Sequence, residues 1–342
     1  MYLLIGSLSA NQAARDISGT VVSLKLLLDS LSALGIAYHF IDTGEIRRCR
    51  YPFTGYIRVA RQVFRKTKHA EAVCMHLSPH GFLYLAPVIL GAKIIYRKPL
   101  VLRLFGGLSL TELSGLRSRL AVFFARRMDA VLLQSKTLVE EGKTLGFKNV
   151  TWFPTSRKLP GPEEPNPWHG ENGDYVFIAQ IKIKKGIFEV IEAARQLPDL
   201  TFSVYGPFYD NLDPSIFAGI RNLTYRGVLK PEEVPGVLQK ARALVFPTYL
   251  DEEGYSGIII EAFGAGCPII CTRWKFLPEI VDESCAVLCR PKNASSLVSA
   301  IKIHWCMKNQ WSALSEGCYG KRLEFSCEVQ AKNHTSICSE LI

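Results

Sequence analysis

The chain has 342 residues, of which 48% are hydrophobic and 21% are charged. These values are typical of a globular protein and exclude a low-complexity chain, and the length favours two domains over a single core. The formal net charge is +10, but residues 1–155 hold 21 Lys and Arg against 9 Asp and Glu, whereas residues 156–342 hold 20 against 22. A basic first domain favours an anionic partner, with a generally basic soluble surface as the alternative.

The first part of the chain alternates short apolar runs with longer amphipathic ones. Strands are predicted at 3–6, 38–41, 73–77, 100–105 and 130–134, and helices at 20–34, 115–128 and 136–145. Strands joined by helical crossovers indicate a parallel sheet covered on both faces. The N-terminus lacks a basic leader and is interpreted as a first strand, and the longest apolar run, 82–92, is too short to cross a bilayer.

A stretch rich in proline separates this part from the next. Residues 154–173 contain five prolines and three glycines, which predicts a linker, and we place the linker itself at 156–173. The alternation then restarts, with strands at 175–179, 201–205, 223–226, 243–247, 268–271 and 286–288 and helices at 186–196, 231–240, 258–263 and 294–307. The predicted fold is therefore α/β, with two Rossmann-like doubly wound sheets, at 1–155 and 174–324, facing a cleft at their carboxyl ends.

Two glutamates eight residues apart are the strongest functional signal. Glu253 lies on a glycine-rich loop, and Glu261 lies about one turn inside the apolar helix that follows Gly257. Each ionised carboxylate accepts hydrogen bonds at two oxygens, so the pair can hold several hydroxyls of one ligand. The amides of the turn from Gly254 through Tyr255 and Ser256 to Gly257, next to a helix N-terminus, favour an anion. A nucleotide-sugar has both features, whereas a glycosidase pair of carboxylates is the competing interpretation.

The ten cysteines are predicted to be reduced and structural. Several lie in apolar runs such as Cys267–Cys271 and Cys285–Cys289, whereas a zinc site would use close Cys or His pairs in loops. This pattern suits a cytoplasmic protein. The sequence also has no Asp-x-Asp, so we expect no metal site for a diphosphate and no cofactor.

Residues 175–290 resemble the retaining glycosyltransferases of family 4, which have the GT-B fold. The resemblance rests on several segments together: Val204–Pro207, Leu223–Val228, Glu232–Leu238, Ala243–Thr248, the Glu-x7-Glu segment, Gly266–Ile270 and Pro278–Val281. It implies that the segment from Phe325 onward forms the C-terminal helix, which crosses back onto the first domain, about 325–342.

The resemblance assigns roles to individual residues. It implies that Glu253 contacts the transferred sugar, that Glu261 binds the ribose hydroxyls and that Lys185 neutralises the diphosphate. The family's arginine position is Gln180 here, a departure for which Lys182 or Lys184 would have to compensate. The family's phosphate-binding loop after the first strand corresponds to Ser18-Gly19-Thr20, with Gly19 retained.

Residues after two strands of the first domain are candidates for the cleft. His76 and His80 follow one predicted strand, and a structural role for each histidine is the alternative. The next strand ends in Arg103-Leu104-Phe105-Gly106, and Phe105 holds the position where family members often carry a histidine. This second departure from the family pattern is expected to change how the acceptor is bound near the transfer centre.

The segment 47–68 mixes eight basic residues with aromatic and aliphatic ones. A basic amphipathic segment suits anionic lipid headgroups, with a solvated basic face or nucleic acid as alternatives; no nucleic-acid motif appears. We therefore expect a metal-independent, retaining glycosyltransferase, cytoplasmic and peripheral at the inner face of the membrane. It would move a sugar from a UDP- or GDP-sugar donor to a glycan or lipid-linked acceptor in surface polysaccharide biosynthesis. A sugar-nucleotide epimerase and a non-catalytic donor-binding subunit are the alternatives.

Overall fold

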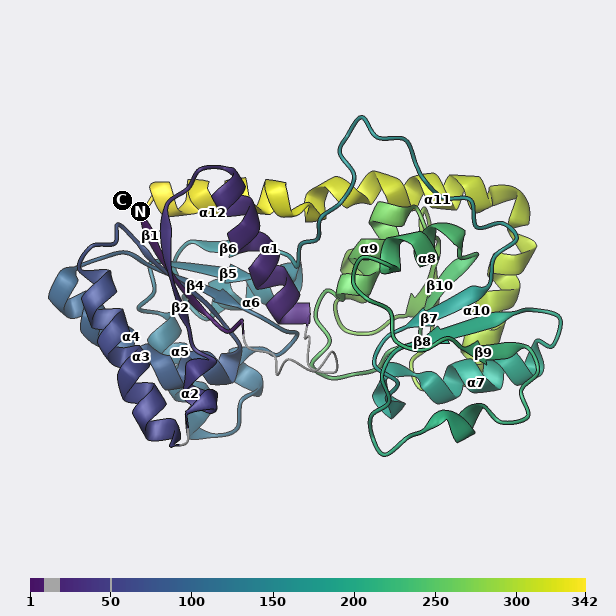
Figure 1. Ribbon diagram of the computed structural model, residues 1–342, viewed down its shortest axis with the longest axis horizontal. Helices are drawn as coiled ribbons and strands as arrows, with labels where there is room; N and C mark the ends of the chain where they lie inside the picture. Colours follow the sequence, from purple (N-terminus) through teal and green to yellow (C-terminus); the bar gives the residue numbers. More distant parts are fainter. Residues whose placement is uncertain (9–18, 50) are drawn as a thin grey trace. The chain divides into compact units, whose positions relative to one another are not determined.

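The computed structural model describes residues 1–8, 19–49 and 51–342 (Figure 1). The chain divides into two compact units, and the first is discontinuous in sequence. Unit 1 comprises Met1–Lys158 together with Ser326–Ile342, and unit 2 comprises Leu159–Phe325. Within 154–173 there is no helix or multi-residue strand. Its residues from Leu159 onward belong to unit 2, where Trp168 Nε1 donates to Ala241 O at 2.9 Å.

Unit 1 is built on a six-stranded sheet with the order β2-β1-β3-β4-β5-β6, and every neighbouring pair is parallel. Its strands are β1 (Tyr2–Gly6), β2 (Tyr38–Asp42), β3 (Val73–Leu77), β4 (Leu100–Leu104), β5 (Ala130–Leu133) and β6 (Val150–Trp152). Its helices are α1 (Gly19–Ala33), α2 (Glu45–Arg48), α3 (Pro52–Thr67), α4 (Pro79–Tyr96), α5 (Leu116–Ala125), α6 (Lys136–Thr144) and α12 (Cys327–Ser339). Right-handed crossovers place α1 on one face and α3 to α6 on the other. The C-terminal helix α12 lies beside α1 (Figure 1).

Unit 2 repeats this architecture with the order β12-β11-β10-β7-β8-β9, again all parallel. Its strands are β7 (Tyr175–Ile178), β8 (Phe202–Tyr205), β9 (Leu223–Tyr225), β10 (Ala243–Phe246), β11 (Ile269–Thr272) and β12 (Ala286–Cys289). Its helices are α7 (Ile187–Gln196), α8 (Val234–Lys240), α9 (Gly257–Ala265), α10 (Ala294–Cys306) and α11 (Trp311–Gly320). The prediction of two doubly wound parallel sheets is confirmed.

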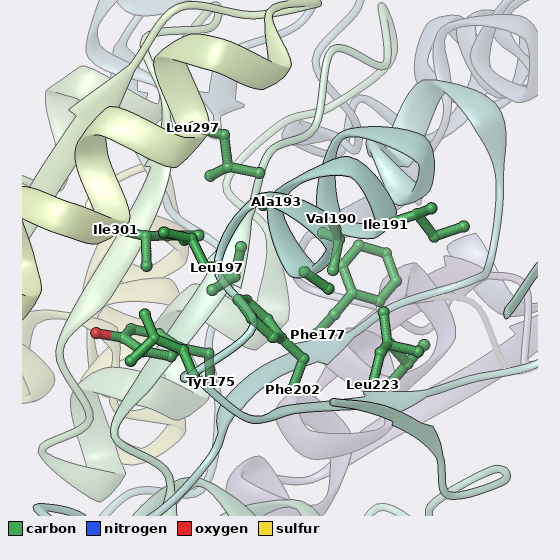
Figure 2. Packing of buried hydrophobic residues seen from close by; sticks show 14 of the residues in the cluster. Tyr175, Phe177, Val190, Ile191, Ala193, Leu197, Phe202, Leu223, Leu297 and Ile301 are labelled. Carbon is green, nitrogen blue, oxygen red and sulfur yellow. The ribbon is translucent and has the colours of Figure 1, made fainter. Parts of the chain in front are cut away.

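The core of unit 2 shows why these segments adopt this arrangement. Phe177 of β7 and Phe202 of β8 pack under Val190 of α7 and Ile301 of α10 (Figure 2). All four side chains are at most 2% exposed. Complete burial of such a side chain is worth about 1.5–3 kcal/mol, so α7 and α10 are fixed to one face of the sheet.

Helix α4 is longer than the apolar run predicted. It has 18 residues despite the internal Pro87, and it is the one helix in the described part of the chain long and apolar enough to cross a membrane. Six of its residues, among them Phe82 and Ile89, are buried in unit 1. Such burial is typical of a helix that covers a sheet, so its length is only weak evidence for a membrane span.

Candidate functional site

The strand order of unit 2 reverses at its centre, between β7 and β10. Chain connections run outward in opposite directions from these adjacent strands, and the loops after their carboxyl ends therefore diverge. In open parallel sheets, ligands bind at this switch point. The loop after β7 carries Gln180 and Lys185, and the loop after β10 carries Thr248, Glu253 and Gly254.

Lys185 and Glu253 form an ion pair at this point. Lys185 Nζ lies 2.5 Å from Glu253 Oε2, and the side chains are only 12% and 8% exposed. The hydroxyl of the fully buried Thr248 donates to the same carboxylate oxygen at 3.0 Å. The ammonium also lies 5.1 Å from the ring centroid of Phe246. Two charges that are 68 residues apart in the sequence are thus held together in a largely desolvated position.

The backbones of the two loops meet closely, and a glycine is required for this approach. Gly186 has a φ of +85°, and a Cβ there would lie 2.4 Å from Pro247 O. Next to this contact, Tyr249 N donates to Lys184 O at 2.8 Å. The position of Lys185 against Glu253 is therefore set by main-chain contacts as well as by the ion pair.

The two other lysines of the loop have different surroundings. Lys184 Nζ lies 2.6 Å from Asp251 Oδ2, and both side chains are about half exposed. Lys182 Nζ lies 4.4 Å from the ring centroid of Tyr209. Gln180 is half-buried directly after β7. Compensation for Gln180 by Lys182 or Lys184 stays a prediction.

Helix α9 carries the second glutamate. Ser256 is its N-cap residue, Gly257 is its first residue, and Glu261 lies half-buried in its second turn. Tyr255 is only 3% exposed and donates its hydroxyl to Glu279 Oε2 at 2.6 Å. The Tyr255 side chain therefore fixes the loop that precedes α9. The backbone amides that follow it, from Ser256 and Gly257, lie at the start of that helix.

The predicted residues of unit 1 differ in exposure. Gly19 is the exposed first residue of α1, and Ser18 before it lies outside the described residues. His80 is exposed in the first turn of α4. Gly106 has a φ of +96°, and its N–H donates to Gln134 Oε1 at 3.1 Å.

Three further predicted cleft residues, His76, Arg103 and Phe105, are buried and do not reach solvent in this structure; each is at most 3% exposed. The Arg103 guanidinium lies 4.4 and 4.5 Å from the ring centroids of Phe105 and Phe153. Burial lowers the pKa of Arg103 to about 9, so this side chain is still a cation at neutral pH. Burial, with the nearby His334 and Arg103, lowers the pKa of His76 well below its usual value, so its ring is neutral.

Two further residues of the site, Thr248 and Glu279, belong to sequence segments that carry the family resemblance. Thr248 orients Glu253, and Glu279 accepts from Tyr255. Thr248 also follows a predicted strand, where polar side chains meet ligands in parallel sheets. Its own carbonyl accepts a hydrogen bond from Thr272 Oγ1 at 2.5 Å, which couples the loop to the end of β11.

Comparison with known proteins identifies the family of this sheet and its loops. Residues 173–305 match the family described as glycosyl transferases group 1, and this segment contains Lys185, Glu253 and Glu261. Over this segment the chain is similar to that glycosyltransferase family. Over 129 residues the chain is 29% identical to the putative teichuronic acid biosynthesis glycosyltransferase TuaC of Bacillus subtilis. Over 153 residues it is 26% identical to O-antigen chain mannosyltransferase B of Escherichia coli. These alignments cover 37% and 42% of this chain, and 31% and 39% of those proteins.

Solved structures match the chain over almost its whole length and show its GT-B fold. HepE of Anabaena, solved with UDP, has a TM-score of 0.75 at 14% identity, covering 99% of this chain and 100% of that chain. Sucrose-phosphate synthase of Thermosynechococcus elongatus has a TM-score of 0.76 at 13% identity, covering 99% and 98%. The lipopolysaccharide outer core galactosyltransferase WaaB has a TM-score of 0.67 at 14% identity, covering 99% of both chains.

Proposed function

We propose that this glycosyltransferase transfers a sugar, with retention, from a UDP- or GDP-sugar to a glycan or lipid-linked acceptor in surface polysaccharide biosynthesis. The observation that carries the proposal is the buried pair of Lys185 and Glu253 at the switch point of unit 2. Support for the donor comes from HepE, which was solved with UDP and with UDP-glucose. Support for the pathway comes from the teichuronic acid and O-antigen relatives.

The leaving diphosphate sets the chemical requirement of the site. As the bond between sugar and diphosphate breaks, positive charge develops on the sugar and negative charge on the leaving oxygens. Lys185 neutralises the diphosphate, and the first amides of α9 add oriented dipoles. Glu253 then exchanges its contact with Lys185 for hydroxyls of the sugar, while Glu261 holds the ribose.

Transfer does not require a divalent cation in this proposal, because the lysine and the helix N-terminus supply the positive potential. Rates measured with and without added Mg²⁺ or Mn²⁺ are expected to agree. A strong dependence on added metal would mean that the cation, and not Lys185, bears most of the diphosphate charge.

We propose further that the protein is cytoplasmic and binds the inner face of an anionic membrane through unit 1. Arg58, Arg61 and Arg65 are exposed along one side of α3, as is its C-cap residue Lys68. Val59 and Val63 on the other side are buried. The apolar side of the helix is therefore used for packing, and the basic side is free to meet headgroups. The three arginines line a groove of about 670 Å³.

Release of nucleoside diphosphate from a panel of sugar nucleotides tests the activity. With the correct donor and a mixture of lipid-linked glycans, the protein should release diphosphate and lengthen the acceptor. Interconversion of the donor sugar without transfer would indicate an epimerase. Donor binding with no release, alone or with acceptor, would indicate a donor-binding subunit.

A further inference from the structure

Two cysteines and a histidine meet inside unit 1, on elements far apart in the sequence. Cys74 lies on β3, and His334 and Cys338 lie one turn apart on α12. Cys74 Sγ is 3.4 Å from Cys338 Sγ, and Cys338 Sγ is 3.8 Å from His334 Nδ1. The three atoms all lie within 4.8 Å of one another, and each residue is 0% exposed.

The separations of 3.4 and 3.8 Å are close to the edges of a tetrahedral zinc site. Zinc binds cysteine sulfur at about 2.3 Å and histidine nitrogen at about 2.0–2.1 Å, so tetrahedral ligand atoms lie roughly 3.6–3.8 Å apart. His334 and Cys338 are four residues apart and therefore project from the same side of α12. Strand β3 supplies the third ligand, Cys74, from the sheet against which α12 packs.

A second imidazole borders the cluster. His76 lies two residues after Cys74 on β3, and its ring stacks on that of His334 with centroids 5.3 Å apart. Neither nitrogen of His76, nor Nε2 of His334, has a hydrogen-bond partner in the part of the chain that the structure describes. Buried imidazole nitrogens without partners are costly, and coordination would satisfy one of them.

We propose that Cys74, His334 and Cys338 bind a zinc ion, with His76 as the adjacent candidate for the fourth ligand. The two cysteines lose their protons to solvent on binding, and their thiolates cancel the charge of the dication. The resulting neutral assembly suits a fully buried position. The metal then fastens the C-terminal helix α12 to the sheet of unit 1, a structural role separate from the proposed transfer reaction.

The metal content of the full-length protein tests this proposal. Protein purified with a phosphine reductant, without chelator and after growth with zinc should contain about one zinc per chain by elemental mass spectrometry. Replacing zinc with Co²⁺ should give a thiolate-to-cobalt charge-transfer band. Absence of zinc from the well-folded wild-type protein would overturn the proposal, and so would a Cys74–Cys338 disulfide found in its place by peptide mapping.

Variants on the same helix separate coordination from packing. Cys338→Ser should lower the zinc content at least tenfold and remove the cobalt band. Cys327→Ser alters another buried cysteine of α12 and should leave both unchanged. Equal loss of zinc from the two variants would overturn the proposed ligand set, and the wild-type measurement decides the case even if Cys338→Ser does not fold.

Discussion

At the scale of single residues, the proposed chemistry depends on how Lys185 is used. Without a donor its ammonium is paired with Glu253, so the site holds two opposite charges away from water. Such a pair is a weak source of net stability, but removing one partner leaves the other charge buried and uncompensated. A diphosphate that enters the site has to compete with Glu253 for the same ammonium. The pair is therefore an expected point of coupling between donor binding and the loop after β10.

Replacement of Lys185 by alanine should impair both turnover and stability. Loss of one donor to the leaving group costs about 2.7–4 kcal/mol of barrier, which is a 10²–10³-fold loss in kcat. The unpaired Glu253 should lower the free energy of unfolding by about 3–5 kcal/mol. Assays of diphosphate release and urea unfolding measure the two effects. Lys184→Ala is the matched control for stability, because its pair with Asp251 is half exposed and screened by solvent, so its loss should change the free energy of unfolding little.

The two glutamates should separate nucleotide binding from sugar handling. Glu261→Ala should weaken calorimetric binding of UDP or GDP more than Glu253→Ala does, because only Glu261 is assigned to the ribose. A lost hydrogen bond to a charged group is worth about 1.5–3 kcal/mol, so a weakening of roughly 10- to 100-fold is expected for Glu261→Ala. Equal and negligible effects of the two substitutions would contradict these role assignments.

At the scale of elements, a buried histidine joins two helices and one strand of unit 2. His304 at the end of α10 is 0% exposed, and its Nδ1 lies 3.1 Å from the hydroxyl of Tyr175 on β7. Its ring stacks on Trp311 of α11 with centroids 5.4 Å apart. Burial, and to a lesser extent Arg242, lowers the pKa of His304 to about 4. The imidazole is therefore neutral in the folded protein at neutral pH.

This histidine should make unit 2 less stable in mild acid. Because its pKa is about 4 folded and about 6.5 unfolded, the unfolded chain binds the proton first as pH falls. Its contribution is complete above about pH 6.5 and is lost on the way to about pH 4, by about 3 kcal/mol in total. Urea unfolding should show this loss in wild type but not in His304→Gln. Replacing the exposed His169 with Gln should leave the dependence of the unfolding free energy on pH as in wild type. If His304→Gln also leaves that pH dependence unchanged, the assignment to His304 is refuted.

The elements differ in how far their sequence predicts them. Most strands follow from short apolar runs, because strands of a covered parallel sheet are buried on both faces. Strand β6 was missed because its three residues are only half-buried at a sheet edge. Helix α4 was missed because it combines an internal Pro87 with apolar residues on both its buried and its exposed sides. The resemblance assigned Glu253 and Lys185 to one donor site, whereas their direct contact follows from the strand order, which places their two loops side by side.

At the scale of the whole molecule, the uneven distribution of charge is the basis for the membrane contact that we propose for unit 1. The basic excess lies before residue 156, and the rest of the chain is slightly acidic. On α3 the exposed arginines are joined at the start of the helix by Tyr51 and Phe53, which are 61% and 72% exposed. Aromatic rings next to basic side chains suit the interfacial region of an anionic leaflet.

Binding to vesicles tests this role of unit 1. The protein should sediment with phosphatidylcholine vesicles that contain phosphatidylserine and stay in solution with pure phosphatidylcholine, and high salt should release it. Each basic residue near the surface contributes about 1 kcal/mol, so replacing Arg58, Arg61 and Arg65 with glutamate should weaken binding by at least about 100-fold. The same charge reversal at the exposed Lys240, Lys302 and Lys308 of unit 2 should have little effect. If both triple variants bind alike, or if salt does not release the wild type, headgroup attraction to α3 is not what brings the enzyme to a membrane.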